Sequence, residues 1–143
     1  MSGSQFFDTN VAIYAYDDSE PAKQSVARSL LLNSVAAATG VLSAQVLGEF
    51  FHATVVRRPL LTNPQARIAI QALSNLRVAM ITPDLVARAI DLHEQFQLRY
   101  WDALIIATAK KEGCAEVLSE DMNHGQDYDG VRVTNPFLAS AKV

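Results

Sequence analysis

Residues 102–107 read Asp102-Ala103-Leu104-Ile105-Ile106-Ala107, so a carboxylate opens an unbroken apolar run. The run predicts a helix from Asp102 to Glu112, closed by Gly113, which is apolar nearly all round and therefore central to the domain. A carboxylate taken out of water has to be paired, hydrogen-bonded or bound to a metal ion. Asp102 is therefore interpreted either as the cap of a central helix, where the helix dipole favours an acid, or as a metal ligand.

Three more acids stand next to apolar sequence in the same way. They are Asp8 after Phe6-Phe7, Glu49 within residues 46–51, and Asp121 after Val117-Leu118-Ser119-Glu120. The basic residues are expected elsewhere, mostly in Arg57-Arg58 and Lys110-Lys111. If the fold brings the four acids together, they repel one another, and a divalent cation removes that repulsion. The four acids thus predict the core of a metal-dependent site.

Each of these three acids also has a plain structural interpretation. Asp8 could cap a helix that follows it, a role that Asp fills well. Glu49 falls on the flank of an apolar helix face, where boundary glutamates are common. Asp121 lies in a loop, and Glu120 could take its place. The three histidines, His52, His93 and His124, have no ligand spacing and are interpreted as surface or core residues.

Short apolar runs alternate with helical stretches along the chain. Strands are expected at residues 5–7, 40–42, 78–81, 115–118 and 131–134, and helices at 20–33, 43–57, 63–76, 82–98 and 102–112. Ser43, Asn63-Pro64 and Thr82-Pro83 are typical helix starts, and Asn135-Pro136 indicates a short terminal helix. This alternation predicts a parallel sheet with helices on both faces.

Two of the acids lie where such a sheet binds ligands. Ligands of open parallel sheets bind beyond the carboxyl ends of the strands. Asp8 and Asp121 both come just after a predicted strand. Their positions therefore predict one shared site.

The composition predicts a single folded domain over residues 1–143. Half of the residues are hydrophobic, and the net charge is -3. That charge argues against broad electrostatic binding of nucleic acid but does not exclude a nuclease, because a cluster of catalytic acids lowers the net charge. Cys114 is the single cysteine, so an intrachain disulfide is impossible and a reducing compartment fits.

The chain shows no sign of a membrane span or of a signal peptide. Its apolar runs fall well short of the ~18 residues that suggest a span, and residues 1–10 lack a basic start and an apolar stretch. A soluble, cytoplasmic protein is expected. Residues 1–4, Met-Ser-Gly-Ser, could be native or a cloning remnant.

Four segments together resemble the PIN-domain ribonucleases, and among them the VapC-type toxins of prokaryotic toxin–antitoxin pairs. The resemblance covers the chain from about Phe6 to Phe137, with the four segments in the family's order and spacing. The segments are Phe6-Phe7-Asp8-Thr9-Asn10, residues 42–50 (LSAQVLGEF), residues 100–107 (YWDALIIA), and Leu118-Ser119-Glu120-Asp121-Met122 with residues 125–130 and Asn135-Pro136-Phe137.

The resemblance implies a three-layer α/β/α fold with a central parallel sheet. It implies that the site binds Mg²⁺ or Mn²⁺, that Asn10 and Ser119 support the site by hydrogen bonds, and that Asp8, Glu49, Asp102 and Asp121 are the metal-binding and catalytic residues. It also implies a homodimer and a cognate antitoxin that places a basic side chain in the acidic pocket.

The resulting hypothesis is metal-assisted hydrolysis of RNA phosphodiester bonds. Three alternatives belong to other classes of protein. A PIN-like module could bind RNA or a partner without catalysis, and a nuclease with this site could act on DNA. A phosphatase with an Asp nucleophile typically has a second Asp two residues after the first, where this chain has Asn10.

Overall fold

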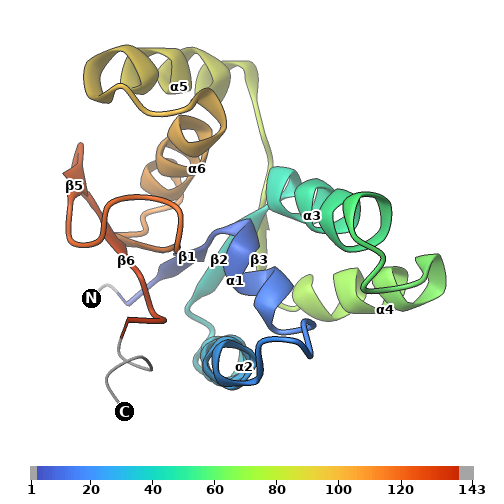
Figure 1. The fold of residues 1–143 in the computed structure, drawn as a ribbon. Coiled ribbons are helices and arrows are strands. Elements are labelled where there is room, and N and C mark those ends of the chain that lie inside the picture. Colours follow the sequence, from blue (N-terminus) through green and yellow to red (C-terminus); the bar gives the residue numbers. More distant parts are fainter. Residues whose placement is uncertain (1–2, 139–143) are drawn as a thin grey trace.

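A six-stranded sheet forms the centre of the computed structural model, which describes residues 3–138. The strand order is β3-β2-β1-β4-β6-β5 (Figure 1). The strands are β1 (Gln5–Phe7), β2 (Gly40–Ser43), β3 (Arg77–Ala79), β4 (Glu116–Leu118), β5 (Asp127–Tyr128) and β6 (Val131–Thr134). All neighbours pair in parallel except β5 and β6. The predicted parallel sheet is confirmed, with a short antiparallel edge strand that was not predicted.

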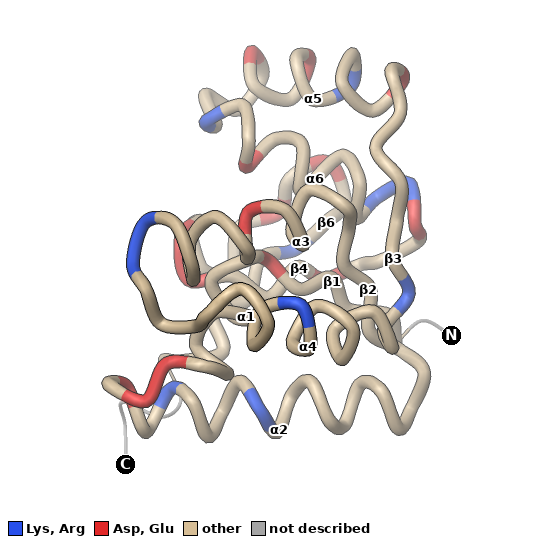
Figure 2. The backbone as a smooth tube through the Cα atoms, turned by 90° about the vertical axis from the view of Figure 1, so that its right-hand side faces the viewer, with Lys and Arg blue, Asp and Glu red and all other residues tan. Residues whose placement is uncertain are grey.

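Helices cover both faces of the sheet, which confirms the predicted α/β architecture. In Figures 1 and 2, α5 and α6 lie on one side of the strands and α2 on the other. The helices are α1 (Thr9–Tyr14), α2 (Pro21–Ala37), α3 (Ala44–Phe51), the π-helical segment η1 (His52–Arg57), α4 (Asn63–Leu73), α5 (Pro83–Phe96) and α6 (Tyr100–Lys111). None of the helices in residues 3–138 combines the length and the hydropathy needed to span a bilayer.

Side-chain caps fix where three helices begin. Ser43 caps α3 and Thr82 caps α5, as predicted, each through a hydroxyl that accepts a hydrogen bond from a backbone N–H. The predicted cap of α4 at Asn63 is wrong. Thr62 is the cap, because its hydroxyl accepts from the N–H of Gln65 while the Gln65 side chain accepts from the N–H of Thr62.

The central helix is α6, as the apolar run predicted. Residues 102–109 are all buried. The helix begins at Tyr100 rather than at Asp102, so Asp102 lies within its first turn and does not cap it. The structural interpretation of Asp102 as a cap is therefore wrong.

The expected terminal helix after Asn135-Pro136 and the first residues of the chain lie partly outside the described residues. Residues 136–138 form a turn, and residues 139–143, which would continue the expected terminal helix, lie outside the described residues. The same holds for Met1 and Ser2.

Candidate active site

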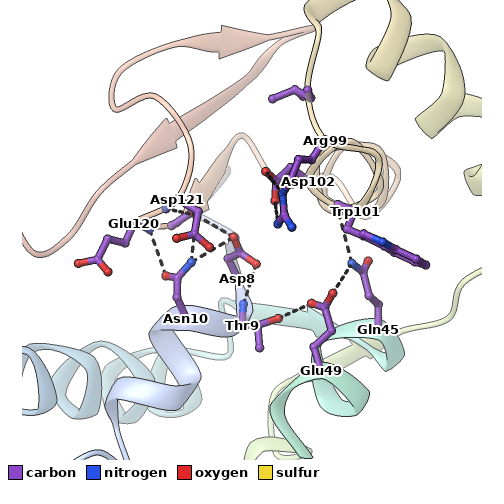
Figure 3. A network of polar contacts seen from close by, with 12 residues as sticks. Asp8, Thr9, Asn10, Gln45, Glu49, Arg99, Trp101, Asp102, Glu120 and Asp121 are labelled. Carbon is purple, nitrogen blue, oxygen red and sulfur yellow. Dashed lines mark hydrogen bonds and ion pairs between the residues drawn. The ribbon is translucent and has the colours of Figure 1, made fainter. Parts of the chain in front are cut away.

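The four predicted acids line one cleft of about 480 Å³. The sheet explains half of this convergence, because β1 and β4 are parallel neighbours with Phe7 opposite Leu118. Asp8 therefore comes off the sheet beside Ser119, and its backbone N–H donates to the carbonyl of Leu118 at 3.0 Å. Helices α3 and α6 supply the other two acids. Figure 3 shows the four carboxylates arranged around the same space.

Asp8 is buried at the base of the cleft, with 5% of its surface exposed. Its Oδ1 accepts from the backbone N–H of Thr9 at 2.7 Å and thereby caps α1. Its Oδ2 accepts from the Ser119 hydroxyl at 2.7 Å. Burial, reinforced by the nearby charges of Asp102 and Asp121, raises the pKa of Asp8 to about 7 despite these hydrogen bonds. Asp8 therefore both caps a helix and faces the cleft.

Glu49 is held at the edge of the cleft by two side chains. Its Oε1 accepts from the Thr9 hydroxyl at 2.7 Å, and its Oε2 accepts from Nε2 of Gln45 at 3.3 Å. The side chain is half-buried, as its predicted place on the flank of the apolar face requires. Thr9 thus connects Glu49 to the same turn that carries Asp8.

Asp102 is paired with a cation. Nη2 of Arg99 lies 3.0 Å from its Oδ1, and Nε of Arg99 lies 3.3 Å from its Oδ2. The expectation that the basic residues lie elsewhere is therefore wrong, because Arg57 lines the cleft as well. Hydrogen bonding to Asp102, with weaker effects from Asp121 and Glu49, raises the pKa of Arg99. Arg99 thus offsets part of the negative charge at the cleft through its ion pair with Asp102.

Asp121 and Glu120, which the sequence left as alternatives, point in different directions (Figure 3). Asp121 lines the cleft. Glu120 accepts from Lys23 at 2.5 Å and from the Tyr14 hydroxyl at 2.6 Å. Burial raises the pKa of Glu120, but these two hydrogen bonds outweigh it and lower the pKa. Glu120 therefore holds the loop after β4 against α2, and Asp121 is the acid that faces the cleft.

Asn10 and Ser119 connect the loop after β4 to Asp8 by hydrogen bonds. The amide of Asn10 donates to Asp8 at 3.4 Å and to the Ser119 hydroxyl at 3.3 Å, and its Oδ1 accepts from the N–H of Glu120. The Ser119 hydroxyl also accepts from the N–H of Asp121 at 3.1 Å. Both side chains thus set the direction of Asp8 and of the Asp121 backbone.

The donor set suits a hard divalent cation. Carboxylate oxygens are the ligands that Mg²⁺ and Mn²⁺ prefer. Burial, with a smaller effect from the charges of Asp102 and Asp121, raises the pKa of Asp8, and a bound cation would favour its charged form. Within residues 3–138, no three His, Cys, Asp or Glu side chains already form a group able to hold a metal. Two of the acids in the cleft are held by protein groups: Thr9 and Gln45 donate hydrogen bonds to Glu49, and Arg99 pairs with Asp102.

Sequence reasoning did not place Arg99 or Trp101 in the cleft, and it did not predict the π-helical segment. Arg99 and Trp101 line the cleft beside Asp102, and their position next to that acid was the available signal. The π-helical segment η1 brings His52 and Arg57 to the same wall. Single π-helical turns are frequent at functional sites, but no local pattern in residues 52–57 distinguishes them from a continued α-helix.

Comparison with known proteins gives consistent matches to one fold. The PIN domain family model matches residues 6–126. A toxin-antitoxin complex from Klebsiella pneumoniae superimposes with a TM-score of 0.68 at 22% identity, over 93% of this chain and 98% of that chain. The sarcin-ricin loop cleaving toxin VapC20 of Mycobacterium tuberculosis gives 0.62 at 22% identity, over 82% of this chain and 92% of that one. No curated protein matches the chain by sequence. At this identity the two structures establish the fold.

Proposed function

Because the chain belongs to the PIN domain family, we propose that it is a metal-dependent endoribonuclease and the toxin of a VapBC-type toxin–antitoxin pair. The observation that carries the proposal is the convergence of Asp8, Glu49, Asp102 and Asp121 on one cleft from four separate segments. In a protein that had lost metal binding and catalysis, nothing would offset the mutual repulsion of four carboxylates in one cleft.

The cleft would hold Mg²⁺ or Mn²⁺ chiefly through Asp8 and Asp102, with Asp121 completing the ligand set. A cation bound there supplies Lewis acidity toward a water molecule and toward the phosphate oxygens. Ser119 and the N–H of Thr9 fix both oxygens of Asp8, so that carboxylate is already oriented. This preorganisation means that little reorganisation accompanies the reaction.

Glu49 is the acid best placed to handle a proton. The attacking water loses a proton as its oxygen bonds to phosphorus. The bond from phosphorus to the leaving ribose oxygen breaks on the opposite side, where that oxygen takes up a proton from solvent water. The hydrogen bonds that Glu49 accepts within residues 3–138 come from neutral groups, Thr9 and Gln45, so its carboxylate is available as a base. Arg99 and Arg57, at the rim, would contact the phosphates of the bound strand.

The proposal includes two protein contacts, a homodimer and a cognate antitoxin. The relative from Klebsiella pneumoniae was solved as a toxin-antitoxin complex. The acidic cleft of this chain would accept a basic side chain of an antitoxin, since four acids line it together with two arginines, of which Arg99 is already paired with Asp102.

Cleavage of a mixed pool of structured cellular RNA tests the proposal. Purified protein is compared in Mg²⁺, Mn²⁺ and EDTA, with single-stranded DNA as a second substrate. Asp8→Asn and Asp102→Asn are run beside Glu120→Gln, a matched control whose carboxylate lies outside the cleft. Discrete RNA fragments that need metal and disappear in the two Asn variants are expected. Cutting of DNA alone would favour a DNA nuclease, and no cutting by folded, metal-loaded protein would favour a binding module.

A further inference from the structure

Trp101 is the one exposed side chain among the Phe, Tyr and Trp residues in residues 3–138, with 52% of its surface exposed. The other residues of these types are buried or half-buried. Tryptophan carries a large apolar surface that proteins bury on average. An indole half in water at the wall of a cleft offers a free aromatic face to whatever the cleft binds.

The backbone of Trp101 is fixed, although its ring is exposed. The residue lies in the first turn of α6, directly before Asp102. Its carbonyl accepts from Nε2 of Gln45 at 3.3 Å, and its ring meets the Tyr100 ring edge-on, with centroids 4.9 Å apart. Figure 3 shows the indole directed outward, beyond Gln45 and away from Asp8. The ring thus lies at the edge of the cleft, with its backbone anchored in α6 and its indole directed away from Asp8.

Few cations line the cleft, so contacts that do not depend on charge could contribute to its affinity for nucleic acid. The chain has a net charge of -3, and Figure 2 shows the Lys and Arg positions spread over several separate segments of the backbone. Phosphate contacts usually dominate binding of nucleic acid, and here Arg57 and Arg99 are the cations that line the cleft. Stacking of a base on an aromatic ring adds affinity that does not depend on net charge.

We propose that Trp101 is the stacking platform for an unpaired nucleobase that flanks the scissile phosphate. The proposal rests on the ribonuclease function above and adds the substrate's conformation to it. A base inside a duplex already stacks on its neighbours and does not present a free face, whereas an unpaired base can be splayed onto a side chain. The outward direction of the indole places that base on a nucleotide next to the reacting one, over the Gln45 side of the cleft. Trp101 is a positioning residue and does not touch the reacting atoms.

The single tryptophan makes a direct measurement possible. Intrinsic fluorescence is followed while a short single-stranded oligoribonucleotide, or the same strand paired with its complement, is added in Mg²⁺ or in EDTA. A gel at the end of each titration reports any cleavage. Quenching by the single strand and little quenching by the duplex are expected. Equal quenching by both would overturn the preference for an unpaired base.

Three variants decide whether the ring carries binding. Trp101→Ala is expected to weaken binding of the single strand, measured by anisotropy of a labelled strand, on the order of tenfold. It should raise KM more than it lowers kcat. Trp101→Phe should recover most of the affinity, because it keeps an aromatic face. Ile90→Ala removes an exposed apolar side chain of α5 outside the cleft and should change nothing.

The failures are distinguishable. Wild-type protein that cuts no RNA refutes the ribonuclease function itself. Active wild type with an equally active Trp101→Ala variant refutes only the stacking platform. If Trp101→Ala instead lowers the solution mass measured by light scattering, the indole belongs to a contact between copies of the chain, and the proposal is overturned. Because the ring is half exposed, the variant is expected to keep the wild-type thermal unfolding profile, which circular dichroism checks.

Discussion

Arg99 holds both oxygens of Asp102, with Nη2 at 3.0 Å from Oδ1 and Nε at 3.3 Å from Oδ2. The two residues are three positions apart at the start of α6, so the pair forms locally. The guanidinium fork matches the carboxylate. A cation that binds Asp102 from the cleft must therefore compete with Arg99.

The competition predicts the effect of Arg99→Gln on metal binding. The variant should bind Mn²⁺ more tightly than the wild type, as measured by calorimetry. The side chain of Arg99 is 68% exposed, so the pair contributes at most about 1 kcal/mol, or roughly fivefold in affinity. Arg77→Gln is the matched control, since its partner Glu112 lies outside the cleft. Weaker Mn²⁺ binding in Arg99→Gln would contradict the competition.

Asp8 gives the metal-free protein a pH-dependent stability. Its pKa is raised from 3.8 to about 7 in the fold, so the folded state binds a proton that the unfolded state releases. The stability that this proton contributes is lost as pH rises from about 4 to about 7. At about 1.4 kcal/mol per pKa unit, the upper bound is roughly 4 kcal/mol.

Asp8→Asn should remove this dependence and keep the cap of α1, because Asn caps helices well. Melting temperatures in EDTA should be higher for Asp8→Asn than for the wild type at pH 8 and should converge near pH 4. Glu94→Gln, at an exposed position of α5, should follow the wild type. A lower melting temperature of Asp8→Asn at pH 8 would show that Asp8 stabilises the fold as an anion.

Glu120 and Asp121 should respond in opposite ways to loss of charge. Glu120→Gln weakens the ion pair with Lys23 and is expected to lower stability by about 1 kcal/mol with cleavage unchanged. Asp121→Asn is expected to reduce metal-dependent cleavage with little change in stability. Urea unfolding and initial cleavage rates separate the two effects. A Lys23→Met, Glu120→Gln double variant should be no less stable than the less stable of the two single variants, because each substitution removes the same ion pair.

Ser119→Ala should shift the pH profile of cleavage. The hydroxyl donates to Asp8 at 2.7 Å and lowers the pKa of that carboxyl. Without the hydroxyl the pKa of Asp8 rises further, so the acid limb of kcat/KM is expected to move to higher pH. Ser25→Ala, at an exposed position of α2, is the control. An unchanged acid limb in Ser119→Ala would mean that Asp8 does not govern it.

Local patterns in the sequence predicted most of the architecture. The apolar run after Asp102 identified the central helix, and the alternation of strands and helices identified the parallel sheet. The strand-end positions of Asp8 and Asp121 predicted that they share a site, because parallel strands end at the same edge of a sheet. The predictions of the fold succeed because burial periodicity and helix caps are encoded by residues that are close in sequence.

The sequence by itself thus determined the fold class, the central helix and the set of acids, while the tertiary structure decided which way each side chain faces. Packing directs Glu120 to Lys23 and leaves Asp121 in the cleft, although the two are neighbours in the chain. It also sets Arg99 against Asp102 and leaves the indole of Trp101 in water. Side-chain direction depends on partners that are distant in sequence, and those partners exist only once the chain has folded.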